Sequence, residues 1–186
     1  MPPDLSMLII GWLLGLIGSL VTGVLLVALE GIQDGRLDAR RQQREDIRVA
    51  RNWVAHGKPS LRGFCLAGAN LSGKHLCEAD LEDASLKGAQ MWGTDLRGAN
   101  LIRASFRRAR LKGVDFRGAN MTLADFTGAE IRESDFSGAS LKSARLAKAR
   151  RIVGCTWAGV EVDEKTELGA ELREEILDQS RHDSNP

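Results

Sequence analysis

Histidine and cysteine are the side chains best suited to act as bases, nucleophiles or metal ligands, and in this chain they are scattered. The 186 residues contain three of each. They are His56, His75, His182, Cys65, Cys77 and Cys155. Catalysis needs a nucleophile, a base and an orienting group within reach of one another, and structural zinc sites use closely spaced cysteines. No such set is legible, so the sequence predicts a protein that is not an enzyme and has no metal and no cofactor.

Glycine and charge could still indicate a phosphate or nucleic-acid site. The 20 glycines do not form a loop before a basic helix start, which a nucleotide site of the glycine-loop type requires. Lys and Arg number 26 and Asp and Glu 25, so the overall balance indicates no polyanionic partner. Nucleic acid binding is therefore not favoured.

The elements that would position any site follow a five-residue repeat. Large apolar residues recur at every fifth position from Leu61 to Leu146, eighteen times without a slip. These centres are Leu61, Leu66, Leu71, Leu76, Leu81, Leu86, Met91, Leu96, Leu101, Phe106, Leu111, Phe116, Met121, Phe126, Ile131, Phe136, Leu141 and Leu146. Neither a helix nor a flat strand would keep them on one face, since the side-chain periods are 3.6 and 2.

The positions around each centre also repeat. Two residues before it Ala is commonest, then comes a polar residue that is often Asp or Asn, and two residues after it Gly is commonest. The departures from Ala are Phe64, Lys74, Thr94, Val114 and Ser134. A chain that turns a corner every five residues would bury one large and one small residue per side, with Gly tolerating the corners. Units that stack only on their neighbours form a solenoid.

The pattern of Ala, Asp or Asn, Leu or Phe and two free positions resembles the pentapeptide repeat family over residues 61–150. The resemblance implies an all-β solenoid, a right-handed quadrilateral β-helix with about 20 residues per coil. Phe106 and Phe126 are 20 residues apart, as are Phe116 and Phe136, so each pair should stack on one side.

Both ends of such a solenoid need caps. Phe64 and Lys74 fall in the first coil, where Phe can cover the open end. The repeat frame ends after Arg150, and residues 151–180 are predicted to form a C-terminal cap with a short amphipathic helix carrying Leu168, Leu172 and Ile176. Residues 181–186 are predicted to be a disordered tail.

Residues 1–30 are predicted to be a transmembrane anchor, because Leu5 to Leu29 contain no charged residue. Such a helix would span roughly 37 Å against a hydrocarbon core of about 30 Å. A cleaved signal peptide fits less well, since the start is not basic and the apolar run is too long. Lys and Arg are absent before the span and frequent after it, which predicts an external N-terminus and a cytoplasmic repeat domain.

Small residues recur every four positions within this span, at Gly11, Gly15, Ser19 and Gly23. The stripe could pack against a second copy, giving a homodimer, or against a partner helix. The alternative remains open that Gly is simply frequent in membrane helices. Residues 31–60 are predicted to be a solvated juxtamembrane helix, from about Asp34 to His56, and a linker that begins at Gly57.

Outward charge distinguishes the sides of the predicted coil. One side carries five basic residues against Asp125 and is the candidate interaction face, with Lys87, Arg107, Arg108, Arg145 and Lys148. Another side stacks Asp95, Asp115 and Asp135, flanked by Arg97 and Arg117. Both could be ordinary solvated faces, or the basic side could dock an acidic partner or lipid headgroups.

The leading hypothesis is a membrane-anchored, cytoplasmic scaffold that binds an unknown protein partner and performs no catalysis. The alternative comes from the family resemblance, since some members imitate DNA, inhibit topoisomerases and give quinolone resistance. That mimicry needs a strongly acidic rod, and residues 61–150 carry 15 basic and 10 acidic side chains. An enzyme or a direct nucleic-acid binder is a third hypothesis, and the basic side lacks the aromatic residues that would support it.

Overall fold

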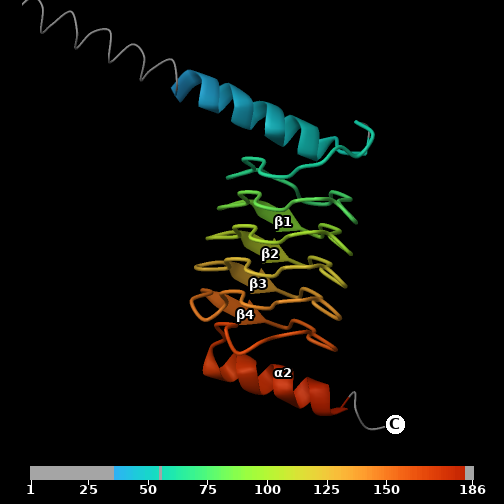
Figure 1. Ribbon diagram of the computed structural model, residues 1–186, viewed down its shortest axis with the longest axis vertical. Coiled ribbons are helices and arrows are strands. Elements are labelled where there is room, and N and C mark those ends of the chain that lie inside the picture. The colour runs from blue at the N-terminus through green and yellow to red at the C-terminus, as the bar shows by residue number, and fades with distance from the viewer. Residues whose placement is uncertain (1–35, 55, 183–186) are drawn as a thin grey trace, which may run out of the picture. The chain divides into compact units, whose positions relative to one another are not determined.

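The structure is a computed structural model that describes residues 36–54 and 56–182. The chain divides into two units, Met1–Gln42 and Gln43–Pro186. Of the first unit, residues 36–42 are described, and they are helical. In the second unit, flat coils stack one on another, and the stack ends at a C-terminal helix (Figure 1).

One side of the coil is a parallel sheet of four short strands. β1 (Gln90–Trp92), β2 (Arg110–Lys112), β3 (Glu130–Arg132) and β4 (Arg151–Val153) are hydrogen-bonded in that order. Met91 pairs with Leu111, and Leu111 with Ile131, so one coil takes 20 residues. The other sides are joined by parallel bridges with the same spacing, such as Asn100 to Asn120. The fold class is thus confirmed as a parallel β-solenoid.

The lumen is filled as the five-residue frame predicts. All eighteen centres are buried, with at most 2 % of their surface exposed. The rings of Phe116 and Phe136 stack 4.8 Å apart, and Trp157 continues this stack at 4.5 Å from Phe136. Phe106 meets Phe116 edge-on across the lumen at 5.8 Å, a favourable aromatic arrangement. One large residue per side is therefore enough to close the interior without a void.

The corners explain why glycine follows each centre by two residues. This position has positive φ from Gly63 to Ser143, at +65° for Gly118 and +62° for Gly98. Within this range the φ value is positive also where the residue is not glycine, as at Arg108 (+56°) and Leu123 (+62°). The corner geometry is thus imposed by coil packing, and glycine adopts it with the least strain.

The departures from Ala at the inner small position have a structural reason. Thr94, Val114 and Ser134 lie one coil apart at the same corner, just after β1, β2 and β3, and all are buried. The Thr94 hydroxyl donates to the Leu71 carbonyl at 3.0 Å, and the Ser134 hydroxyl donates to the Arg132 carbonyl at 3.0 Å. Their polar groups are therefore satisfied inside the solenoid.

The N-terminal cap differs from the sequence prediction. In the second unit, residues 43–51 are helical, and this segment is not simply solvated. Ala50 and Trp53 are buried in the same cluster as the first coil, and Asp46 is buried as well. Asp46 accepts a hydrogen bond from the Cys65 N–H at 2.9 Å. Phe64, predicted to cover the open end, is only half-buried. Asp46, Ala50 and Trp53 therefore form the cap. The many charged residues around them in the sequence made this segment look solvated.

The first coil is also tied to the cap by polar side chains. The Gln43 amide donates to the Ala67 carbonyl at 2.9 Å, and the indole N–H of Trp53 donates to the Pro59 carbonyl at 2.8 Å. Lys58 lies over the Trp53 ring, with Nζ 5.5 Å from its centre. These contacts satisfy backbone groups that an open solenoid end would expose.

The C-terminal end also differs, because the coil does not stop at Arg150. β4 pairs Arg151 with Glu130, a spacing of 21 residues, and the bridges continue to Glu167 opposite Arg145. One inserted residue shifts the frame, so Trp157 takes the next inward position after Phe136. Helix α2 (Ala170–His182) then covers the end with Leu172 and Ile176 buried. It extends two residues beyond the predicted cap.

The predicted anchor, residues 1–30, lies outside the described residues, as do residues 183–186 of the predicted tail. Among the residues that are described, none of the helices combines the length and apolar character needed to span a membrane.

Candidate functional site

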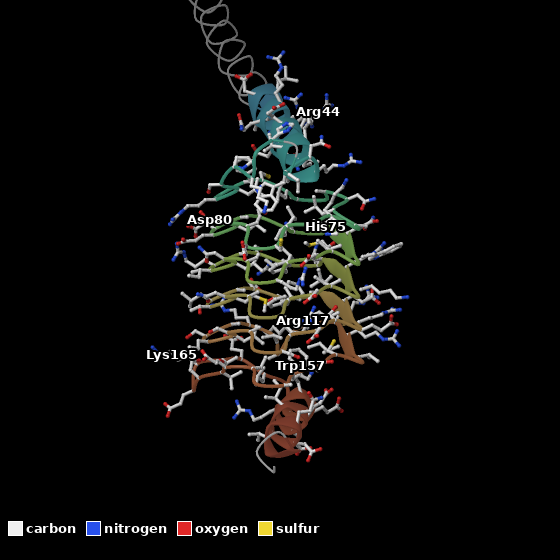
Figure 2. The ribbon with its side chains drawn as sticks, turned by 90° about the vertical axis from the view of Figure 1, so that its right-hand side faces the viewer. Arg44, His75, Asp80, Arg117, Trp157 and Lys165 are labelled. Atoms are coloured by element: carbon white, nitrogen blue, oxygen red, sulfur yellow. The ribbon has the colours of Figure 1, made fainter. Side chains whose placement is uncertain are left out.

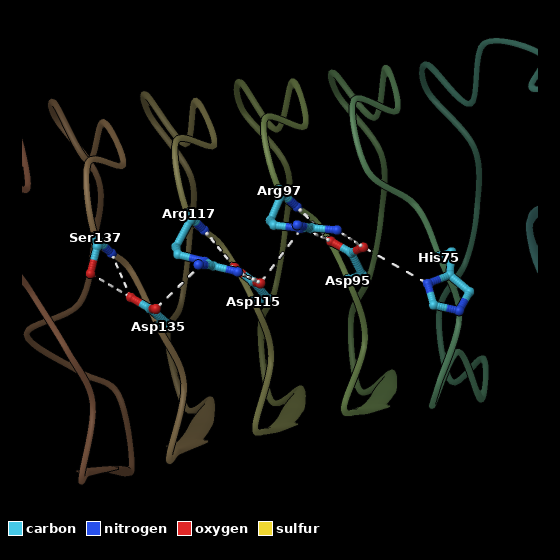
Figure 3. A network of polar contacts seen from close by, with 7 residues as sticks. All are labelled: His75, Asp95, Arg97, Asp115, Arg117, Asp135 and Ser137. Carbon is cyan, nitrogen blue, oxygen red and sulfur yellow. Dashed lines mark hydrogen bonds and ion pairs between the residues drawn. The ribbon is translucent and has the colours of Figure 1, made fainter.

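A continuous ladder of charged residues runs along the side of the coil centred on Leu96, Phe116 and Phe136, here called the ladder side (Figure 3). Arg97 contacts Asp95 at 2.9 Å and Asp115, one coil further on, at 3.6 Å. Arg117 repeats this with Asp115 at 2.7 Å and Asp135 at 3.6 Å. Each guanidinium thus bridges two coils, and the two positive charges offset most of the repulsion among the three carboxylates of the predicted stack.

The ends of the ladder are closed by smaller groups. His75 Nδ1 lies 3.8 Å from Asp95 Oδ2 at one end, and the Ser137 N–H and hydroxyl donate to Asp135 at the other. The hydrogen bond from Arg97 holds the pKa of Asp95 at about 2, against the opposing effect of burial. The same arrangement with Arg117 lowers the pKa of Asp115. Asp95 and Asp115 are therefore ionised at neutral pH, and their charges are used in contacts within the molecule.

The predicted interaction face, here called the basic side, is partly used in the same way. Arg107 contacts Asp125 at 3.0 Å and Arg145 contacts Glu167 at 3.5 Å. Within the described part of the chain, Lys87, Arg108 and Lys148 form no ion pair. The structure thus divides the five predicted residues into two that are paired and three that are free to meet a ligand.

The outward face of the sheet, here called the strand side, was not predicted from the sequence as an interaction face. Each strand has one inward residue between two outward ones, and the outward ones are Gln90, Trp92, Arg110, Lys112, Glu130, Arg132, Arg151 and Val153. Four of them are basic and one is acidic. Figure 2 shows many side chains with nitrogen atoms projecting on the side where the strands lie.

Two large apolar side chains are exposed on this same strand side. Trp92 is 52 % exposed although it follows the buried Met91, and Val153, which follows the partly buried Ile152, is 51 % exposed. A shallow groove of about 180 Å³ runs between Trp92, Lys112 and Arg132. Exposed aromatic and Arg side chains on one flat face are typical of protein-binding surfaces. The residues flanking Met91, Leu111 and Ile131 in the sequence would have indicated this face.

The described residues were predicted to lack a metal site, and their cysteines are far apart in exposure. No group of three His, Cys, Asp or Glu side chains could hold a metal ion there. Cys65 is exposed and Cys155 is buried, and burial raises the pKa of the Cys155 thiol, which makes it less reactive. The predicted packing stripe at Gly11, Gly15, Ser19 and Gly23 lies outside the described residues.

Comparison with known families and structures agrees with the observed coil. The family described as pentapeptide repeats matches eight copies, over residues 65–103, 84–122, 104–142 and 119–150. Comparison with curated proteins gives no match. Proteins of this family form right-handed β-helical solenoids.

Three solved structures illustrate the similarity. A pentapeptide repeat protein of the Arabidopsis thaliana thylakoid lumen is 25 % identical, with a TM-score of 0.43, over 63 % of this chain and 77 % of its own. HetL of the cyanobacterium Nostoc, involved in heterocyst differentiation regulation, is 20 % identical, with a TM-score of 0.25, over 56 % and 74 %. The plasmid-mediated fluoroquinolone resistance protein QnrB1 is 19 % identical, with a TM-score of 0.24, over 63 % and 83 %.

Proposed function

Because this chain belongs to the pentapeptide repeat family, with matches across residues 65–150, we propose that it is a membrane-tethered interaction module that performs no catalysis. The solenoid is a rigid support, since each coil is held by backbone bonds to the next and both ends are capped. A rigid support presents side chains in fixed positions, which lowers the entropic cost of binding a partner. The outward faces are therefore the places where this protein acts.

The strand side carries the proposal. Its exposed Trp92 and Val153 lie among basic side chains. Two of these, Arg110 and Arg151, form no ion pair within the described residues. On the ladder side, in contrast, Arg97 and Arg117 are already held by carboxylates. A partner with an acidic surface and an apolar patch would complement the strand side in both respects.

The tether and its orientation rest on the sequence. The uncharged span from Leu5 to Leu29 is long enough to cross a bilayer, and arginines follow it, beginning at Arg36. We propose that this span anchors the protein, that the N-terminus is external and that the solenoid lies in the cytoplasm. The small-residue stripe within the span offers a contact for a second copy or for a partner helix.

Site-specific photocrosslinking in intact cells would test the interaction face. A photoreactive residue placed at Lys112, on the strand side, should capture a discrete protein partner, and Trp92→Ala together with Arg110→Glu should abolish the product. The matched control places the same residue at Leu123, which is equally exposed at 51 % but lies on another side. Capture only at Leu123, or capture at Lys112 that survives the double substitution, would contradict the proposal.

Imitation of DNA is a weaker candidate. A DNA mimic needs rows of carboxylates that remain available to a basic partner. Here Asp95, Asp115 and Asp135 form such a row, but Arg97 and Arg117 neutralise it. A supercoiling assay with the full chain decides between the two, because inhibition of the topoisomerase would support mimicry and its absence would support the interaction module.

A further inference from the structure

A groove at one corner of the solenoid concentrates positive charge. This corner joins the basic side to the strand side, and the groove has a volume of about 520 Å³. Four cationic side chains line it, namely Arg108, Arg110, Lys148 and Arg150. All four are exposed, and none forms an ion pair within the described residues. The volume is in the range of small-ligand sites, about 300–1,000 Å³.

Elsewhere on the solenoid, several arginines have a carboxylate beside them. Arg62, Arg103 and Arg107 each contact an acidic side chain at 2.7 to 3.0 Å. Arg97 and Arg117 do the same on the ladder side. The four cations of the corner groove have no such ion pair within the described residues. Internal ion pairs of the kind that stabilise the other sides therefore do not account for the positive charge of the groove.

Glu130 is the one acidic residue that lines the groove, and its carboxylate is already occupied. It forms a short contact with Arg132, which is the main reason that the pKa of Glu130 is lowered. The positive charges of Arg150 and Arg110 lower this pKa further, which shows that both lie near the carboxylate without a direct contact to it. Because the single carboxylate of Glu130 is shared among several arginines, the four cations leave the groove with a large excess of positive charge.

The geometry of the corner keeps the groove open. Arg108 and Lys148 are two coils apart, as are Arg110 and Arg150, so each pair is separated by about 10 Å along the solenoid axis. Gly128 occupies the coil between them, and a Cβ atom there would lie 3.3 Å from Cγ of Arg108. Glycine therefore leaves the floor of the groove free and lets Arg108 lie along it.

We propose that this corner binds a phosphate-type polyanion. Arginine matches phosphate oxygens with paired N–H donors, and three of the four cations are arginines. Two pairs of cations about 10 Å apart suit an anion that carries more than one charged group, such as a linear polyphosphate or neighbouring phospholipid headgroups. The groove shares Arg110 with the strand side proposed above to bind a protein partner. Anion binding does not need Trp92 and Val153, which the protein partner requires.

The test uses the full chain in neutral detergent micelles and inorganic tripolyphosphate as the probe, with calorimetry at fixed ionic strength. Saturable binding is expected for the native chain. Arg110→Gln combined with Arg150→Gln should weaken it by about tenfold or more, because two charge-assisted contacts are lost. Arg108→Gln combined with Lys148→Gln should have a similar effect. Thermal unfolding verifies that each variant is folded.

The matched control is Arg97→Gln combined with Arg117→Gln, which removes the same net charge from the ladder side and should leave binding within about twofold. Absence of saturable binding, native affinity in both groove variants, or an equal loss in the control would overturn the proposal. Added phosphatidylglycerol identifies the source of the anion. Weaker binding of tripolyphosphate in its presence supports headgroups as the ligand, and unchanged binding supports a free polyphosphate.

Discussion

The rings of Phe106 and Phe126 lie 4.8 Å apart and are parallel to within 2°. Twenty residues separate them, so this stack measures one coil of the solenoid directly. The spacing equals the distance between neighbouring strands of a sheet, about 4.8 Å, because the rings rise with the backbone. From Leu61 to Leu146, the inward and outward positions of the repeat follow from this register.

Truncation inside the lumen should be costly. Phe126→Ala removes a ring that contacts Phe106 and Phe136, and we expect the free energy of unfolding to fall by about 3–5 kcal/mol. Lys87→Ala, about two coils away at an exposed outward position, should change it by less than about 0.5 kcal/mol. Denaturant unfolding followed by circular dichroism measures both. Similar losses for the two variants would contradict the assignment of inward positions.

The ladder side predicts a specific pH dependence. The pKa of Asp95 is lowered from 3.8 to about 2, so its contact with Arg97 stabilises the folded chain fully above the unfolded value and is lost as pH falls towards 2. Arg97→Gln should therefore lower the free energy of unfolding at pH 7, and the difference from the native chain should shrink between pH 5 and 2. Unfolding curves at several pH values give this difference.

The control for that experiment is Lys87→Gln, which removes a positive charge that has no ion pair among the described residues. Its stability difference from the native chain should stay small across the same pH range. If Arg97→Gln shows a difference that does not change with pH, the contact with Asp95 is not its cause.

The N-terminal cap should protect one coil rather than the whole molecule. Trp53 is 4 % exposed and packs with the first coil, so Trp53→Ala should destabilise that end by about 3–5 kcal/mol. In a solenoid each coil contacts only its neighbours, so the loss should be local. Hydrogen exchange should accelerate at Leu61, Cys65 and Leu66 and stay slow near Phe126. Uniform acceleration along the chain would contradict a local role.

The repeat could be predicted from the sequence because a narrow lumen accepts only one arrangement of large and small residues. Leu61 to Leu146 keep the frame without a slip, and this strict spacing has no other physical explanation than a coil with five residues per side. The stacking of Asp95, Asp115 and Asp135 could be predicted from their spacing of 20 residues, which is one coil. Arg97 and Arg117, which flank this stack in the sequence, contact its carboxylates in the structure.

The ends could not be predicted in the same way. Asp46, Ala50 and Trp53 form a stripe with helical spacing, but the surrounding charges made the segment look solvated. At the other end a single extra residue places Arg151 opposite Glu130, so a search with a strict five-residue step stops one coil too early. Caps and insertions depend on tertiary contacts that a repeat pattern does not contain.

The distribution of charge needed the structure for a similar reason. Arg107 belongs to the predicted interaction face, but its partner Asp125 is 18 residues away and becomes a neighbour only through the coil. Arg110 and Arg150 flank the strand side and were not grouped with Arg108 and Lys148 in the sequence, although the corner brings all four to one groove. The net charge of each side, counted from the sequence, therefore did not predict which charged side chains are free of ion pairs and can bind a ligand.

Crosslinking between adjacent coils tests the 20-residue register most directly. The exposed thiol of Cys65 lies one coil from Ser85, and these two residues form a parallel bridge. In the full chain, Ser85→Cys should be joined to Cys65 by dibromobimane, a short bifunctional thiol reagent, with the linked peptides identified by mass spectrometry. Ser105→Cys, two coils from Cys65, should not be joined to it. A link from Cys65 to position 105 in preference to position 85, or to neither, would contradict the solenoid.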